Sequence, residues 1–289
     1  MKQLSIIIVT YKSRKHILDC LESIFKYNDI GDALEVIIVE NNSEEKDLMF
    51  EDVRSRYNDN ITLINSGVNA GYGTGNNIGI RASSSPNIIV MNPDVRLVCP
   101  IFKNVIEALN QPNVGMIGVD FVDGSPAYYF KKEHRSVFKM VFMRLYLWRR
   151  KYDPEKMFMS GSFFGFNKDA FNKAGMFDEN IFMYSEEADI TNRMLKAGYK
   201  VEWHPEIKVL HLAHGREYNE NLHRIRLQSG KYYDKKYNLD SEKNFEVDKR
   251  ALQVDIFISK LLGKKKRAEG MKKSLETLIS FHDKGTESK

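Results

Sequence analysis

Three acidic side chains of this sequence are spaced closely enough to do chemistry together. Glu186, Glu187 and Asp189 lie within four residues, directly after the aromatic run FMY. Mutual repulsion between such neighbours can raise the pKa of one carboxyl into the range of a general base. The dipole of a helix also favours acidic residues in its first turn without any function. Three acids exceed what capping needs, so we expect a catalytic carboxylate here.

A separate aspartate, Asp94, follows Asn92 and Pro93 at the end of a predicted strand. The proline fixes the turn, and a carboxylate together with diphosphate oxygens is a usual way to hold Mg²⁺ or Mn²⁺. An aspartate in a turn is also ordinary without a ligand. His211 is a second candidate for such a metal site, and a structural histidine is the alternative interpretation.

The glycine-rich stretch NAGYGTGNNIGI, residues 69–80, is similar to a phosphate-binding loop. It matches neither the Walker pattern nor the dinucleotide fingerprint, and it follows the third predicted strand instead of the first. The pattern therefore excludes a P-loop NTPase and a dinucleotide-dependent oxidoreductase.

The elements that must position these residues alternate between strand and helix. Helices are expected at 15–27 and 47–57, and strands at 4–11, 34–43, 61–66 and 87–95. The first two strands are continuous apolar, β-branched runs, which predicts that they are buried. Such alternation predicts an α/β fold with a mainly parallel central sheet and helices on both faces.

Polar residues follow all four strands, and parallel sheets bind ligands at the carboxyl ends of their strands. Any one of these residues is also a common turn residue. Because four strand ends converge on one edge, we interpret them together as a ligand site. The residues are Thr10, Tyr11, Glu40, Asn69, Gly71, Asn76, Asn77, Asn92 and Asp94.

The second half of the chain continues the same domain. A strand is predicted at 158–166, where the small residues around Gly161 allow another group to approach closely. A helix is predicted from Ser185 to Gly198, and a strand pair from 201 to 215. We expect one domain at 1–215, divided into halves 1–98 and 99–215, and a helical, basic extension at 216–289.

The positive charge is concentrated in two stretches. Residues 131–156 carry nine Lys or Arg and three Asp or Glu, and residues 259–289 carry nine and four. The overall charge of +5 is too weak to indicate nucleic acid. In the extension, Val254, Phe257, Ile258 and Leu261 form an apolar stripe just before the KKKR run. This pattern fits an anionic membrane surface or a helix packed on the core.

The two cysteines, Cys20 and Cys99, form no disulfide framework and no zinc spacing. No signal peptide or membrane span is recognisable. We expect a cytoplasmic protein, with peripheral contact at the inner face of the cell membrane as an open alternative.

The motifs together resemble family 2 glycosyltransferases of the GT-A fold, most closely their bacterial rhamnosyltransferase-like branch. They are SIIIVTYKS, VIIVENNS, NAGYGTGNNIGI, MNPDV and the long segment from MSGSFFGF to KAGYKV, in one order between residues 4 and 215. The resemblance implies an inverting transfer of a sugar from a nucleotide diphosphate donor, dTDP-rhamnose or a UDP-sugar, to a hydroxyl. The implied acceptor is a saccharide or lipid-linked saccharide for bacterial surface polysaccharide.

The resemblance also implies roles for single residues. Thr10 and Tyr11 would line the nucleobase and ribose, and Glu40 would contact the nucleoside in place of the usual Asp. Asn69, Gly71, Asn76 and Asn77 would lie along the nucleotide. Asn92-Pro93-Asp94 replaces the Asp-x-Asp motif, so Asp94 would hold Mn²⁺ or Mg²⁺, with His211 completing the site.

The catalytic motif, usually Glu-Asp-x-Asp, is Glu186-Glu187-Ala188-Asp189 here. Glu187 takes the position of the catalytic base, and Glu186 is the substitute if the longer side chain does not fit. We expect Asp189 to orient Arg193, and Gly161 to leave room for the donor sugar.

Two other functions stay open. A sugar nucleotidyltransferase has a similar sheet, but it uses a basic, glycine-rich loop after the first strand, where this chain has TYKSRKH. A nucleotide-sugar- or glycan-binding protein with impaired catalysis is the other alternative, because the motif departs from its usual form at Glu187.

Overall fold

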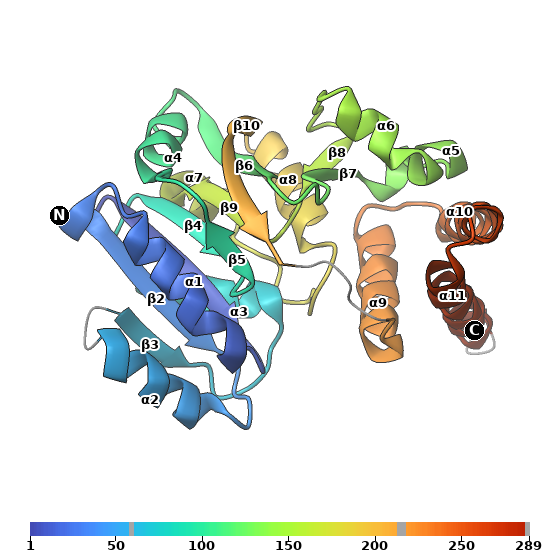
Figure 1. Ribbon diagram of the computed structural model, residues 1–289. Helices are drawn as coiled ribbons and strands as arrows, with labels where there is room; N and C mark the ends of the chain where they lie inside the picture. Colours follow the sequence, from blue (N-terminus) through green and yellow to red (C-terminus); the bar gives the residue numbers. More distant parts are fainter. Residues whose placement is uncertain (58–60, 213–217, 287–289) are drawn as a thin grey trace. The chain divides into compact units, whose positions relative to one another are not determined.

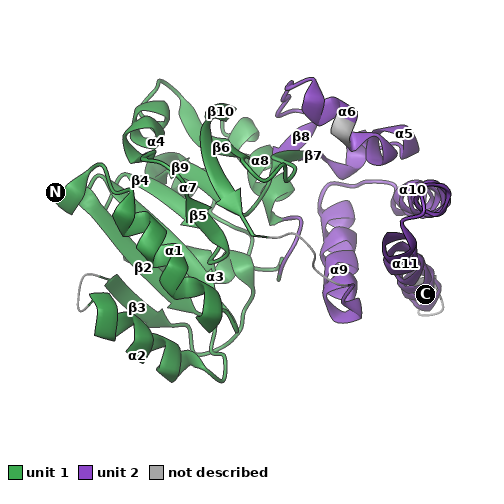
Figure 2. Ribbon diagram, viewed as in Figure 1, with its two compact units in different colours: residues 1–128, 159–182, 186–214 green, residues 129–158, 183–185, 215–289 purple. Residues whose placement is uncertain are grey.

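The structure is a computed structural model that describes residues 1–57, 61–212 and 218–286. The described chain forms two compact units (Figure 2). Unit 1 comprises residues 1–128, 159–182 and 186–214, and unit 2 comprises residues 129–158, 183–185 and 215–289. The break at residues 214 and 215 lies at the expected boundary, whereas residues 129–158 group with the C-terminal helices instead of the first domain.

Unit 1 is built on an eight-stranded sheet with the order β3-β2-β1-β4-β9-β6-β10-β5 (Figure 1). Its strands are β1 (Leu4–Thr10), β2 (Leu34–Glu40), β3 (Ile61–Asn65), β4 (Asn87–Met91), β5 (Val95–Leu97), β6 (Val114–Phe121), β9 (Phe163–Asn167) and β10 (Lys200–His211). The pairs among β1 to β4 and the β6–β10 pair are parallel. β9 runs antiparallel to β4 and β6, and β5 runs antiparallel to β10. A mainly parallel α/β sheet was predicted, and it is confirmed.

The helices cover both faces of this sheet. They are α1 (Arg14–Lys26), α2 (Lys46–Tyr57), α3 (Tyr72–Ala82), α4 (Phe102–Leu109), α7 (Lys168–Lys173) and α8 (Glu186–Lys196). α1 and α2 lie on one face and α3 on the other, as right-handed crossovers between parallel strands require (Figure 1). Strands β1, β2 and β4 are buried along most of their length, which explains their continuous apolar sequences. In β3, at the edge of the sheet, only Ile61 is buried.

Three of the predicted strands or strand pairs are divided or joined differently in the structure. The stretch 87–95 is divided between β4 and β5, because Pro93 lacks the N–H that a sheet interior requires. The stretch 158–166 is divided at residues 160–162. The predicted strand pair after residue 200 is one strand, β10, whose register shifts between His204 and Lys208 around Pro205.

Unit 2 is mostly helical. The two-stranded sheet of β7 (Tyr128–Phe130) and β8 (Met157–Met159) flanks the short helices α5 (Val137–Val141) and α6 (Met143–Trp148). Three longer helices follow: α9 (Glu220–Lys236), α10 (Ser241–Leu261) and α11 (Lys265–Thr286). The helical character predicted for the C-terminal region is confirmed. Within the ranges that the structure describes, no helix is both long and apolar enough to cross a membrane.

Candidate active site

The ends of β1 and β2 bring two of the predicted site residues together. The parallel register places Thr10 beside Glu40. Thr10 is fully buried, whereas Tyr11 is 45% exposed. The Glu40 carboxylate accepts the backbone N–H of Ser43 at 2.9 Å and also the Ser43 hydroxyl. Glu40 therefore fixes the turn after β2, and its contact with a nucleoside stays a prediction.

The glycine-rich segment is held against the turn after β2 and against the chain at Phe182. Asn41 donates its side-chain N–H to Gly71 O at 3.0 Å, and Asn69 Oδ1 accepts the backbone N–H of Gly71 at 3.3 Å. Gly71 has a φ of +95°, and a Cβ there would overlap the carbonyl oxygen of Phe182. Only glycine fits this position, just before the first residue of α3.

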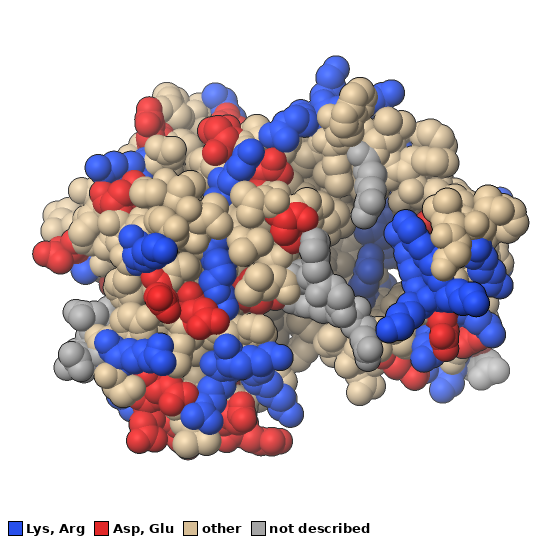
Figure 3. All heavy atoms as spheres, in the orientation of Figure 1, with Lys and Arg blue, Asp and Glu red and all other residues tan. Residues whose placement is uncertain are grey.

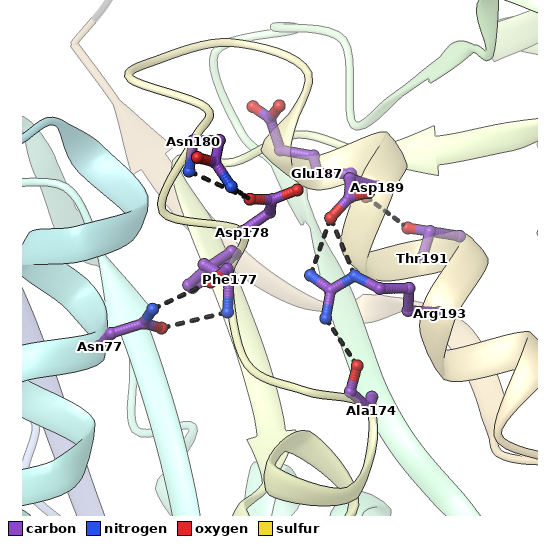
Figure 4. Close-up of polar contacts among 9 residues, drawn as sticks. All are labelled: Asn77, Ala174, Phe177, Asp178, Asn180, Glu187, Asp189, Thr191 and Arg193. Atoms are coloured by element: carbon purple, nitrogen blue, oxygen red, sulfur yellow. Dashed lines mark hydrogen bonds and ion pairs between the residues drawn. The ribbon is translucent and has the colours of Figure 1, made fainter. Parts of the chain in front are cut away.

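The two asparagines of α3 have different surroundings. Asn77 donates to Phe177 O at 2.9 Å and accepts the Phe177 N–H at 3.1 Å, which ties the loop before α8 to the helix (Figure 4). Asn77 therefore holds this loop, and its contact with a nucleotide stays a prediction. Asn76 is fully buried and donates to Tyr72 O at 2.9 Å.

Three buried acceptors near the same strand ends have no hydrogen-bond partner among the described residues. They are Thr10 Oγ1, Asn41 Oδ1 and Asn76 Oδ1. Buried polar atoms in folded proteins are almost always paired, so a bound ligand is one explanation for such a group.

Asp94 and His211 come together because the antiparallel β5–β10 pair places His211 opposite Val95. Asp94 Oδ1 lies 3.7 Å from His211 Nε2, and both side chains are nearly buried. Arg96 holds the turn that carries Asp94, donating to Pro93 O at 2.7 Å and to Val95 O at 2.9 Å. The two predicted metal ligands are thus neighbours at one strand end.

A divalent cation fits this pair as part of a larger ligand set. In the described parts of the chain, no cluster of three or more His, Cys, Asp or Glu side chains could hold a metal ion. One carboxylate with one imidazole leaves most of an octahedral shell to other oxygens. Mg²⁺ and Mn²⁺ accept this arrangement when a substrate supplies phosphate oxygens.

Of the three acids at the start of α8, Asp189 is committed to an ion pair. It is fully buried and lies 2.9 Å from Arg193 Nε and 2.8 Å from Arg193 Nη2. Arg193 also donates to Ala174 O at 2.6 Å, as Figure 4 shows. The predicted contact between Asp189 and Arg193 is present, and it locks α8 to the turn after α7.

Glu186 is buried as well, in a different environment. Burial, followed by the neighbouring charges of Glu187 and Asp189, raises the pKa of the Glu186 carboxyl well above its ordinary value. Its Oε2 atom has no hydrogen-bond partner among the described residues. These surroundings favour the protonated form of the Glu186 carboxyl.

Glu187 is only partly buried, and its carboxylate points away from the Asp189–Arg193 pair (Figure 4). It lies against Gly161, where a Cβ would overlap Glu187 Oε1. The Tyr72 hydroxyl donates to Gly161 O at 2.6 Å. Burial and then the charges of Glu186, Glu187 and Asp94 raise the pKa of Tyr72 well above its usual value. The carboxyls of Glu186, Glu187 and Asp94 thus all influence the ionisation of the Tyr72 hydroxyl.

Three residues of this site have roles that the sequence did not predict. Tyr72 and Asn41 lie within motifs that the sequence singled out, and Arg96 directly follows one, but nothing in the spacing indicates their partners. Tyr72 meets Gly161 across 89 positions of the sequence, and Arg96 contacts His16 O across 80. Only the folded sheet brings these pairs together.

The chain is similar to known enzymes over much of its length. It is 26% identical over 200 residues to a low-salt glycan biosynthesis hexosyltransferase of Haloferax volcanii, covering 67% of this chain and 62% of that protein. It is 28% identical over 180 residues to an N-acetylglucosaminyl-diphospho-decaprenol L-rhamnosyltransferase of Mycobacterium tuberculosis, covering 53% and 59%. The chain thus spans about three fifths of the length of these relatives.

Solved structures share the fold at low sequence identity. A mannosyltransferase from Pyrobaculum calidifontis, in complex with GDP-Man and Mn²⁺, superposes with a TM-score of 0.59 at 13% identity. The match covers 99% of this chain and 76% of that one. GalNAc-T7 with UDP, GalNAc and Mn²⁺ gives 0.57 at 14% identity, covering 73% and 44%. The expected GT-A fold is thereby confirmed.

The family follows from a match that includes the strand ends, the glycine-rich segment and the Gly161 loop. The profile described as glycosyl transferase family 2 matches residues 5–175, more than half of the sequence. The chain belongs to glycosyl transferase family 2.

Proposed function

We propose that this protein is an inverting, metal-dependent hexosyltransferase that moves a sugar from a nucleotide diphosphate sugar to a hydroxyl. The observation that carries the proposal is that the three acids at the start of α8 have different surroundings. Asp189 is paired with Arg193, and Glu186 is buried in surroundings that raise its pKa and favour its protonated form. Glu187 is partly exposed beside Gly161. Among these three, Glu187 is the carboxylate suited to accept a proton from an acceptor hydroxyl.

The reaction is a single displacement. Glu187 takes the proton of the acceptor hydroxyl while that oxygen forms a bond to the anomeric carbon. The bond between this carbon and the diphosphate oxygen breaks on the opposite side, so the anomeric configuration inverts. Asp94 and His211 are the residues that would hold Mn²⁺ or Mg²⁺. Such an ion supplies charge neutralisation for the departing diphosphate.

The donor would lie across the ends of β1, β2 and β4. Support comes from the buried acceptors there, Thr10 Oγ1 and Asn76 Oδ1, which lack partners in the described chain. The names of the relatives favour transfer of a hexose or rhamnose and a lipid-linked saccharide acceptor. We propose dTDP-rhamnose or a UDP-sugar as the donor. A role in building a bacterial surface polysaccharide belongs to the same proposal.

The test compares four proteins with the same donors and acceptors: wild type, Glu187→Gln, Glu187→Asp and Glu186→Gln. Purified protein with Mn²⁺ is assayed for release of the nucleoside diphosphate from dTDP-rhamnose, UDP-sugars and GDP-mannose. Nuclear magnetic resonance assigns the anomeric configuration of the product. Glu187→Gln should lower turnover roughly 10²–10⁴-fold with unchanged donor affinity, because a positioned base contributes about that factor.

Glu186→Gln is the matched control, since glutamine is a neutral isostere of a protonated glutamate. It should keep most of the turnover, and Glu187→Asp should retain activity. If Glu186→Gln were inactive and Glu187→Gln active, the base would be Glu186. Donor binding without transfer or hydrolysis in the wild type would instead indicate a binding protein.

A further inference from the structure

Unit 2 exposes large apolar side chains along α5 and α6. Phe138 lies on α5, Phe142 lies between the two helices, and Leu145 and Trp148 lie on α6. Phe138 is 55% exposed and Trp148 is 78% exposed. The rings of Phe138 and Phe142 lie 4.7 Å apart, so they form one continuous apolar surface.

The end of α10 repeats this arrangement. Val254, Phe257 and Leu261 follow one another at helical spacing, and Leu262 comes next. Phe257 is 67% exposed, Leu261 77% and Leu262 61%. The apolar stripe that the sequence predicted is therefore present. Its outer residues are exposed instead of being packed into a core.

Both apolar stripes lead directly into basic runs. Arg149, Arg150 and Lys151 follow Trp148, and all three are exposed. The run 264–267 follows Leu262 and is exposed as well, with Arg267 placed 3.5 Å from Asp255. Residues 137–151 and residues 256–268 each contain five Lys or Arg and no Asp or Glu. We call these two segments the basic–apolar segments.

The two basic–apolar segments belong to one packed unit. Helix α5 packs against α10, and Arg135 just before α5 lies 3.7 Å from Asp248 of α10. Figure 3 shows Lys and Arg side chains gathered over the part of the molecule that α10 and α11 occupy. A single exposed apolar residue is ordinary, but runs of them beside clustered charge mark an interaction surface.

We propose that the basic–apolar segments dock on an anionic lipid bilayer, with the apolar side chains in the interfacial layer and the basic runs at the headgroups. A bilayer offers both chemistries at once: negative headgroups for Lys and Arg, and an apolar layer for Phe, Leu and Trp. Trp in particular prefers the membrane–water interface. A second copy of the chain would bring like charges together, which disfavours it as the occupant.

The proposal is tested with vesicles of phosphatidylcholine, with and without phosphatidylglycerol. Wild-type protein should sediment with the anionic vesicles and be released by salt, because screening weakens headgroup attraction. The sequence has two Trp, Trp148 and Trp203, so Trp203→Phe leaves Trp148 as the only indole. Its fluorescence should shift to the blue when anionic vesicles are added.

Variants separate the two parts of the surface. Replacing Lys264, Lys265 and Lys266 by Gln should weaken partitioning roughly 100-fold, since each basic residue near the surface contributes about a fivefold factor. Phe257→Ser with Leu261→Ser should weaken partitioning by at least about tenfold. All five side chains are exposed, so folding should be preserved.

The matched controls lie in unit 1. Replacing the exposed Lys103, Lys196 and Lys200 by Gln removes the same charge, and Leu48→Ser removes an apolar side chain that is 49% exposed. Both controls should bind like the wild type. Equal binding to neutral vesicles, binding that salt does not weaken, or equal losses in the controls would overturn the proposal. The proposal would also be overturned if the wild type did not bind vesicles but formed a dimer in solution that Phe257→Ser abolishes.

Discussion

Glu186 and Glu187 are adjacent in the sequence, yet their carboxyls lie in different environments. Glu186 is 3% exposed and its pKa is raised by burial and by Glu187, whereas Glu187 is partly open beside Gly161. At the scale of the residue, the proposed chemistry depends on this difference. A helix start turns successive side chains by about 100°, so neighbours in sequence face different surroundings.

The raised pKa of Glu186 predicts a pH effect on stability. Below the unfolded pKa of ~4.3 both states carry the proton, so folding is unaffected. Above it the unfolded state ionises while the folded state keeps its proton, so the free energy of unfolding falls as pH rises. Glu186→Gln removes this decline. Denaturant titrations between pH 4 and pH 8 should show the variant gaining stability relative to the wild type, and a gap that is constant with pH would contradict the buried acid.

At the scale of the element, the sequence predicted the strands well because buried parallel strands are continuous apolar runs. The run from Leu4 to Thr10 needed no tertiary information. The sequence did not predict the division of 87–95 into β4 and β5. β4 lies inside the sheet, whereas β5 forms its edge beside β10, a strand that is distant in the sequence. The sequence also did not predict the partners of Asn77 and Tyr72, because these partners, Phe177 and Gly161, are distant in the sequence.

Two glycines that precede α3 should differ in how much their replacement by alanine lowers the free energy of unfolding. Gly71→Ala places a Cβ on the Phe182 carbonyl in a backbone conformation that favours glycine. It should lower the free energy of unfolding by more than about 2 kcal/mol. Gly67 also has a positive φ, +76°, with nothing within 4 Å of its Cβ position. Gly67→Ala should therefore cost only about 1 kcal/mol, and equal losses in urea unfolding would show that contact with Phe182 is unimportant.

At the scale of the whole molecule, Asp94 and His211 predict that metal and nucleotide bind together. Two protein ligands leave Mn²⁺ weakly held until a diphosphate supplies further oxygens. The melting temperature should rise more with Mn²⁺ and a nucleoside diphosphate together than the separate effects add up to. A ligand at a hundred times its Kd contributes about 2.7 kcal/mol. Asp94→Asn should remove the synergy, and a large shift with Mn²⁺ alone would indicate other metal ligands.

The pairing of β5 with β10 has a consequence for folding. Asp94 enters the sheet with β5, whereas His211 is the last residue of β10, after every other strand of unit 1. On a ribosome, the chain can therefore complete β1 to β4 and the turn at Asp94 long before His211 is synthesised. Contacts between distant parts of a chain form slowly, because the intervening loop must close first. If Asp94 and His211 hold the metal as proposed, the metal would bind only after the last strand of the sheet has been synthesised and paired.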